Sequence, residues 1–317
     1  MINKEVPTRG VPVARRRKRI ERSRLMLTLY ALPFLVLVVM FCYVPLLGWS
    51  YAFFQVRLGL PLANSKFVGL ANFQYILRDL RNVRQVLNNT FVFYGLQLLN
   101  SVVPVVLAVM ISEVPGRRYK KLVQTTTTLP NFISWVIVYS FAFSLFSSQG
   151  LVNDILVSLG VIEKPYLILQ NRGAVYWFQN TMTIWKNSGW TSIIYLAAIT
   201  GIDGELYDAA SVDGAGRVNK IFHITLPGIA PTYAVLLLLS AGNMLTVGFD
   251  QYLLFDNPFT RTNIQVLDLY IYFVGLQSSA PDIAYATAIG MLKTVISVIL
   301  LFTVNFISKK VRGSSLI

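Results

Sequence analysis

The chain has 317 residues, of which 55% are hydrophobic and 13% charged, and its mean hydropathy is +0.57. Because about a quarter of the residues in a soluble domain are charged, this composition excludes an ordinary water-soluble enzyme and favours a membrane protein. With one histidine, His223, and one cysteine, Cys42, the chain also lacks the residues for Cys/His zinc sites, histidine-based triads and an intrachain disulfide.

The first 24 residues form a basic tail that contributes much of the net charge of +14. Its clustered cations are Arg15, Arg16, Arg17, Lys18, Arg19, Arg22 and Arg24. The cluster ends at Leu25, where a long apolar run begins, and no nucleic-acid recognition motif follows it. We therefore interpret it as a cytoplasmic flank that binds anionic membrane lipids, and expect no nucleic-acid partner. The apolar run has no small-residue cleavage site, so no cleavable signal peptide is predicted.

Six apolar segments are predicted to span the membrane, because about 20 helical residues cross a hydrocarbon core of about 30 Å. They are 25–54, 87–111, 123–147, 174–200, 228–250 and 284–308. The first three are covered by stretches free of Asp, Glu, Lys and Arg: Leu25–Val56, Gln85–Ser112 and Leu122–Asn153. The fourth and sixth contain Lys186 and Lys293, which must face protein, water or headgroups. The expected fold is an all-α, polytopic membrane protein.

The distribution of cations predicts the topology of the chain. Between and beyond the predicted spans, 18 Lys and Arg residues lie on one side and eight on the other. By the positive-inside rule, both termini are predicted to be cytoplasmic. The expected organisation is a basic tail (1–24), a first span with an external segment (25–86), a transmembrane core (87–308) and a cytoplasmic C-terminal tail (309–317).

Several predicted spans contain residues that break helices in water, including Pro33, Pro45, Pro104, Pro130 and Gly290. In a membrane, neighbouring helices can satisfy the backbone groups that such residues free. These prolines and this glycine fit kinked helices around a translocation path, and they fit ordinary packing of a helix bundle equally well. No internal repeat is apparent, which disfavours a secondary transporter built from inverted repeats within one chain.

The segment between the fourth and fifth spans is too patterned for a simple connector. Asp203 can cap a helix that begins near Glu205, and Gly214 and Gly216 permit a sharp turn after it. A second short helix is predicted to follow and to stop at Pro227.

This helix pair presents small side chains at Ala209, Ala210 and Ala215, which would let a partner backbone approach closely. That pattern favours a docking element. The alternative is an amphipathic helix on the headgroups, for which Arg217 and Lys220 would be the only cationic anchors.

The same segment resembles the EAA loop of ABC importer permeases. The matching residues are Ala209, Ala210, Gly214, Ile224, Leu226 and Pro227. The first position is Asp208 instead of Glu, so the carboxylate is withdrawn by one methylene. The resemblance extends over residues 60–310 and favours the carbohydrate branch, closest to polysaccharide and oligosaccharide permeases of Gram-positive bacteria. It is carried there by Phe67–Phe73, by Trp190 with Tyr195–Ala197, by Gly248–Gln251 and by Ala286–Gly290.

The resemblance implies the fold of a type I importer permease that is not itself an enzyme. Its loop, residues 205–227, would couple the spans to an ATPase. The implied coupling residues are Glu205, Asp208, Ala209, Ala210, Asp213, Gly214, Ala215, Ile224, Leu226 and Pro227. The implied partners are a second, distinct permease, two ATPase subunits and an external sugar-binding lipoprotein. ATP and Mg²⁺ would bind the ATPase subunits, because the chain has no Gly-x-x-x-x-Gly-Lys-Ser/Thr phosphate loop.

Substrate contacts are expected from the fourth and fifth spans, because residues of the fifth span line the sugar site in the maltose-importer relative. The candidates for the substrate path are Asn243, Phe249, Asp250, Gln251, Lys186 and Trp190. Asn243 could equally bond a neighbouring helix. Lys186 lies too deep for easy snorkelling and is expected to face a cavity, whereas the sequence leaves Lys293 undecided.

Other classes of function stay open at this point. The chain could serve an importer of a non-sugar solute. A channel or secondary transporter would require an intramembrane acidic relay, and the spans contain almost no acids. A lipid-modifying enzyme would need clustered catalytic residues at the interface, whereas the carboxylates here cluster in the loop.

Overall fold

The computed structural model describes residues 14–56 and 62–312, with the backbone alone for 14–23, 63, 307, 308 and 310–312. Residues 1–13 and 313–317, which make up much of the two predicted tails, lie outside the described residues. The chain divides into two units, residues 1–51 and 52–317. The first unit holds α1 (Ala14–Val38), which begins inside the predicted basic tail and continues through a π-helical stretch, Val39–Tyr43, into a 3₁₀ helix, Val44–Phe53.

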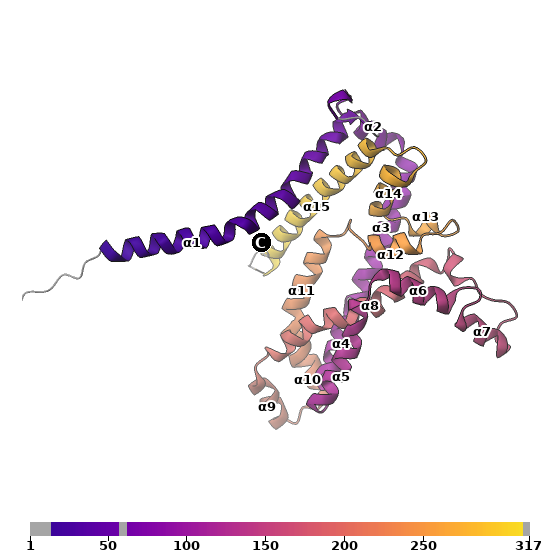
Figure 1. Ribbon diagram of the computed structural model, residues 1–317. Helices are drawn as coiled ribbons and strands as arrows, with labels where there is room; N and C mark the ends of the chain where they lie inside the picture. The colour runs from indigo at the N-terminus through magenta and orange to yellow at the C-terminus, as the bar shows by residue number, and fades with distance from the viewer. Residues whose placement is uncertain (1–13, 57–61, 313–317) are drawn as a thin grey trace, which may run out of the picture. The chain divides into compact units, whose positions relative to one another are not determined.

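The second unit is predominantly helical (Figure 1). Its helices of more than one turn are α2 (Ala71–Arg78), α3 (Leu80–Asn100), α4 (Val102–Glu113), α5 (Arg117–Thr128), α6 (Trp135–Phe146), α7 (Leu151–Ser158), α8 (Val175–Thr200), α9 (Gly204–Val212), α11 (Leu226–Gly242), α12 (Phe249–Phe255), α14 (Leu267–Tyr272) and α15 (Ile283–Arg312). Single-turn helices are α10 (Arg217–Lys220) and α13 (Arg261–Ile264). Two short strands, β1 (Phe54–Gln55) and β2 (Lys66–Phe67), pair antiparallel with Phe54 opposite Phe67.

Five helical runs among the described residues are long and apolar enough to cross a membrane. They are Arg24–Phe53, Leu80–Glu113, Trp135–Ser158, Arg217–Gly242 and Ile283–Phe306. These runs overlap five of the six predicted spans. The fourth predicted span coincides with α8, which is long enough but carries more polar side chains and is not among the five.

The predicted span 123–147, which contains Pro130, is not one continuous helix in the structure. After α5 the chain forms a 3₁₀ turn, Leu129–Phe132, and α6 begins only at Trp135. The reason is local, because Pro130 has no N–H to continue the α-helical bonding. Ser134 then caps the new helix by accepting a hydrogen bond from the Ile137 N–H at 3.4 Å.

The fifth predicted span also ends earlier than expected, at Gly242 instead of residue 250. The chain then turns through Gly248, whose φ of +53° lies in the left-handed region that favours glycine. This turn starts α12 in a new direction and brings Phe249–Phe255 against the other helices.

The core of the second unit forms around α8, which packs against α4, α5 and α11. One apolar cluster joins α8 to α4 and α11 through Ala108, Tyr195 and Ile229. A second joins α3 to α12 and includes Phe93 and Tyr252, whose ring centroids are 4.5 Å apart. Helix α8 is therefore the element that positions most of the polar side chains described below.

Candidate functional site

The loop between α8 and α11 contains two short helices joined by a glycine turn, as the sequence predicts (Figure 1). Asp203 caps α9, because its Oδ1 accepts a hydrogen bond from the Glu205 N–H at 3.0 Å. The helix ends at Gly214, whose φ is +77°. The Ala215 N–H then donates to the Ala210 carbonyl at 2.8 Å, which is the closing bond of a glycine-terminated helix.

Side chains tie the two short helices together. The hydroxyls of Tyr207 and Thr225 lie 3.0 Å apart, which links α9 to the residues just before α11. The Lys220 ammonium donates to the Ser211 hydroxyl at 2.5 Å. These contacts join α9 to α10 and to the residues at the base of α11.

The prediction that the second short helix stops at Pro227 is wrong. The chain stays helical from Arg217 to Gly242, through a π-helical stretch at Ile221–Thr225 and then α11. The π stretch widens the helix just before the proline, where the normal bonding pattern lacks a donor. As a result, the loop is continuous with the fifth span.

The loop has an exposed apolar surface made of Leu206, Val212, Val218 and Phe222. Val212 is 89% exposed. Among the predicted coupling residues, the half-buried ones are Ala210, Ala215, Ile224 and Leu226, and the exposed ones are Glu205, Asp208, Ala209, Asp213, Gly214 and Pro227. Exposed large apolar side chains are typical of surfaces that bind a partner or a membrane, and an ATPase as the partner of this loop stays a prediction.

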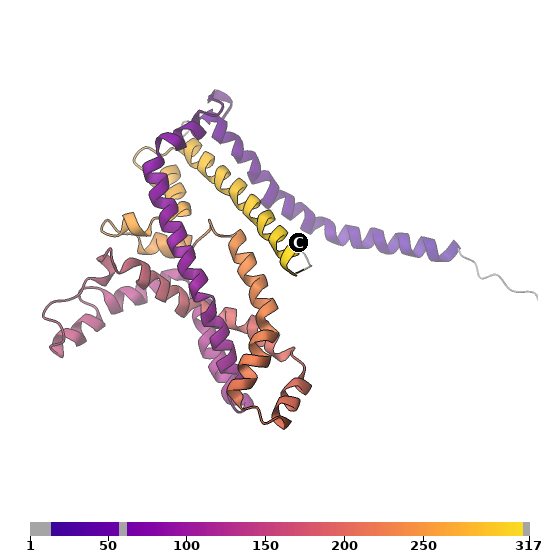
Figure 2. The same cartoon turned by 180° about the vertical axis from the view of Figure 1, so that it is seen from behind.

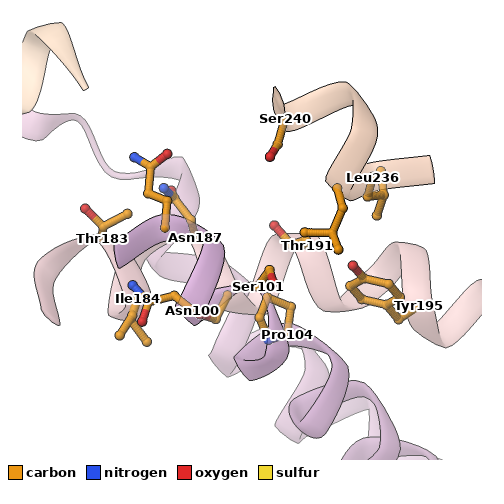
Figure 3. Close-up of a pocket in the computed structure, with 13 residues that line it drawn as sticks. Asn100, Ser101, Pro104, Thr183, Ile184, Asn187, Thr191, Tyr195, Leu236 and Ser240 are labelled. Carbon is orange, nitrogen blue, oxygen red and sulfur yellow. The ribbon is translucent and has the colours of Figure 1, made fainter. Parts of the chain in front are cut away.

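A cavity of about 260 Å³ lies between α8, the junction of α3 and α4, and α11 (Figure 3). Its polar lining consists of Gln97, Asn100, Ser101, Thr183, Asn187, Ser188, Thr191, Tyr195 and Ser240. No charged side chain lines it. Amide and hydroxyl groups of this kind can donate to and accept from sugar hydroxyls.

The cavity lies beside the junction of α3 and α4, the middle of α8 and the last two turns of α11, and side-chain pairs hold its walls in place. The amides of Asn100 and Asn180 are hydrogen-bonded to each other and join α3 to α8. The hydroxyls of Ser101 and Tyr233 lie 2.8 Å apart and join the start of α4 to α11.

Sequence reasoning missed most of this cavity, although a signal was present. Asn180, Thr183, Asn187 and Thr191 recur at intervals of three and four residues in α8, so they share one helix face. A polar stripe in an otherwise apolar span predicts a face turned toward protein or water. The opposite walls of the cavity could not be identified in the same way.

A second cavity of about 610 Å³ adjoins the break between α5 and α6. Lys186, Asn187 and Asp250 line it together with the break segment Asn131–Val136. Asn187 lines both cavities, and its Oδ1 accepts a hydrogen bond from the Asn131 Nδ2 at 3.4 Å. The Asn187 side chain is therefore a wall of both cavities.

The Lys186 side chain is buried, and its ammonium donates to three backbone carbonyls of the break segment. The distances from Nζ are 3.3 Å to Pro130, 2.8 Å to Asn131 and 2.6 Å to Ile133. The ammonium also lies 5.5 Å from the centre of the Trp135 ring. Lys186 thus supplies hydrogen-bond donors to three backbone carbonyls at the break between α5 and α6.

The structure brings only Lys186 and Asp250 together among the predicted substrate-path residues. Gln251 is buried, donates to the carbonyl and side-chain oxygens of Gln179 and accepts from the Thr183 hydroxyl. Of the remaining candidates, Asn243 donates to Leu239, Phe249 packs on Tyr272 and Trp190 packs on Phe132. The role of all six in substrate contact stays a prediction.

The second intramembrane lysine, Lys293 of α15, forms an ion pair with Asp268 of α14. Their side chains are 14% and 19% exposed. The pair satisfies a charge in the sixth predicted span and joins two helices that also pack together.

Breaking this pair is expected to destabilise the protein by about 2 kcal/mol, because the remaining charge stays largely buried without its partner. Lys293→Met and Asp268→Asn should each lower the Tm of the solubilised protein. The double variant should recover part of the loss, since neither charge is then left alone. A double variant whose Tm falls by the sum of the two single losses would show that the groups are not coupled.

Comparisons with known proteins relate the chain to membrane components of transport systems. Residues 101–313 match the family described as binding-protein-dependent transport system inner membrane component. The polygalacturonan/rhamnogalacturonan transport system permease protein YteP of Bacillus subtilis is 36% identical over 306 residues, covering 92% of this chain and 93% of that protein.

Two solved structures have the same fold. A crystal structure of a bacterial ABC transporter involved in the import of the acidic polysaccharide alginate has a TM-score of 0.81 at 35% identity, covering 94% of this chain and 99% of that one. A crystal structure of bacterial alginate ABC transporter in complex with alginate pentasaccharide-bound periplasmic protein gives 0.82 at 34% identity, with the same coverage. The match to the family model over most of the transmembrane core shows that the chain belongs to the family of binding-protein-dependent transport system inner membrane components.

Proposed function

We propose that this chain is one permease subunit of an ATP-driven importer that moves oligosaccharides across the cytoplasmic membrane. The observation that carries the proposal is the uncharged cavity, which is lined by amides and hydroxyls on three different helices. Polar groups between membrane-spanning helices are costly unless they serve a polar ligand or each other. The named relatives of the chain, which handle polygalacturonan, rhamnogalacturonan and alginate, support a sugar as that ligand.

In this proposal the chain has six spans and both termini are cytoplasmic. The span beyond the five found by length and composition is α8, the fourth in chain order, whose 26 residues reach about 39 Å. Its polar side chains do not argue against a span, because Gln179, Asn180, Lys186 and Ser192 are buried within the protein. The cation count supports the orientation.

The complete importer would contain a second, homologous but distinct permease, two ATPase subunits and an external binding lipoprotein. The complex of the alginate transporter with a periplasmic protein supports the last of these partners. ATP would bind the ATPase subunits, and the exposed surface of the loop would receive their movement. Because the loop is continuous with α11, a shift of the loop would tilt the fifth span and change access to the cavity.

The test is ATP-dependent uptake of labelled oligosaccharides by vesicles that contain the co-expressed complex. Gly214→Asp should reduce uptake about tenfold or more, because a left-handed φ costs a non-glycine residue about 1–2 kcal/mol and the turn would shift. The permease pair should still assemble, since no side chain lies within 4 Å of the Gly214 position.

Gly216→Asp is the matched control. It adds the same charge two residues away, at a φ of −70° and at the N-cap of α10, where Asp is favourable. Its uptake should stay close to that of the wild type. Unchanged uptake in Gly214→Asp would contradict a coupling role for the loop, and ATP-independent uptake by the wild type would contradict the importer itself.

A further inference from the structure

The external end of α3 carries a polar and cationic face that nothing described above uses. Arg81, Arg84, Asn88 and Phe91 follow one another at intervals of three and four residues, so they share one side of the helix. All four are exposed. The opposite side of α3, including Val86, packs into the protein. Figure 2 shows the unit from behind, where α3 passes in front of α8 and α12.

This face forms a groove of about 980 Å³. Its lining combines two guanidinium groups, of Arg81 and Arg84, and two amides, of Gln85 and Asn88, with the apolar side chains of Leu80, Val83, Leu87 and Phe91. Gln85 is fixed at the edge of the groove, because its side-chain nitrogen donates to the Thr262 carbonyl at 2.8 Å. No carboxylate lines the groove.

The two guanidinium groups have no ion-pair partner in the part of the chain that the structure describes. The nearby carboxylate of Asp79 is already engaged, since it accepts hydrogen bonds from Asn82, Tyr270 and Tyr285. By contrast, the external Arg261 pairs with Asp256 at 2.5 Å, and this hydrogen bond raises the pKa of Arg261.

The position of the arginines is also unusual for the proposed topology. The positive-inside rule disfavours Lys and Arg beside the external end of a span. Arg81 and Arg84 lie in the first two turns of the run Leu80–Glu113, on the side proposed to be external. Two arginines without an ion-pair partner among the described residues can bind an anionic group from outside the chain.

We propose that this groove binds the carboxylates of an acidic oligosaccharide on the external face and so selects uronate-containing substrates. Guanidinium groups bind carboxylates in a bidentate geometry. Asn88 can bond sugar hydroxyls, and the Phe91 ring offers an apolar surface to a sugar face. Charge complementarity selects this occupant, because the groove has cations and amides but no acid. The inference rests on the proposed function and adds a substrate class and a site to it.

The test compares uptake of trigalacturonate and of neutral maltotriose by vesicles holding the complete complex with its binding protein. Arg81→Gln/Arg84→Gln should raise the KM for trigalacturonate about tenfold or more, because both charge-assisted bonds to the carboxylates are then lost. The KM for maltotriose should change less than about twofold. Arg78→Gln is the matched control, since Arg78 is exposed one turn away in α2 but does not line the groove, and it should leave both values unchanged.

A binding measurement separates this inference from the proposed function. Trigalacturonate is titrated against the purified permease complex, without binding protein, in nanodiscs of phosphatidylcholine. Weaker binding by the double variant than by Arg78→Gln supports the site even if no oligosaccharide is taken up, in which case only the proposed function fails.

Three results would overturn the inference. The first is equal trigalacturonate binding by the wild type and the double variant, with or without uptake. The second is an effect of the double variant that appears only when anionic lipid is added to the nanodiscs, which would assign the groove to headgroups. The third is a double variant that no longer assembles with the second permease, which would assign the groove to the subunit interface.

Discussion

Replacing Gly189 with alanine is expected to prevent the protein from reaching a stable fold. Gly189 lies in α8 where this helix crosses the end of α5. A Cβ at this position would lie 1.9 Å from the Thr127 carbonyl oxygen, 2.3 Å from its carbon and 2.9 Å from the Thr128 nitrogen. All three are backbone atoms, so no side chain can rotate away. The two helices would have to separate, at a cost above about 3 kcal/mol.

The measurement is the yield of monodisperse complex after solubilisation, together with its Tm. Gly95→Ala is the matched control, because Gly95 is a helical glycine of α3 with nothing within 4 Å of an added Cβ. Its Tm should equal or slightly exceed that of the wild type, since alanine favours a helix. If Gly189→Ala has the yield and Tm of Gly95→Ala, the close approach of α5 and α8 is wrong.

The coupling loop could be predicted from the sequence because its constraints are local. Asp203 bonds two residues ahead, and Gly214 must adopt a positive φ where it ends a helix. Both effects act within a few residues, so spacing alone reveals them. The continuation past Pro227 could not be predicted in this way, because it depends on a π-helical turn inside a longer helix, for which the sequence gives no local signal.

The cavities could be predicted only in part, because they depend on contacts between residues far apart in the sequence. The polar stripe of α8, from Asn180 to Thr191, can be predicted from its spacing, but Asn100 of α3 and Ser240 of α11 reach the same cavity only through contacts that the fold creates. The same holds for the intramembrane charges. Their positions predict that a partner exists, whereas the partner of Lys293 lies 25 residues away in another helix.

Replacing Lys186 with methionine is expected to destabilise the break between α5 and α6. Methionine keeps an unbranched chain of similar length but removes all three donors of the ammonium. The carbonyls of Asn131 and Ile133 then lose the donor that Lys186 supplies, at about 1–3 kcal/mol each. The Pro130 carbonyl keeps its bond from the Ile133 N–H. The Tm of the solubilised complex should fall clearly, and the same change at the exposed Lys164 should leave it unchanged.

This experiment also decides between two roles for Lys186. If the ammonium mainly holds the break segment, then Lys186→Met lowers the Tm and the uptake together. If it instead binds the substrate, as its depth in the span suggests, uptake falls while the Tm stays at the wild-type value. The second outcome would require another donor for the Asn131 and Ile133 carbonyls, such as water in the cavity beside them. If instead the Tm falls, the Lys186 ammonium stabilises the fold. Sugar recognition would then rest on the uncharged side chains of α8 that line the first cavity.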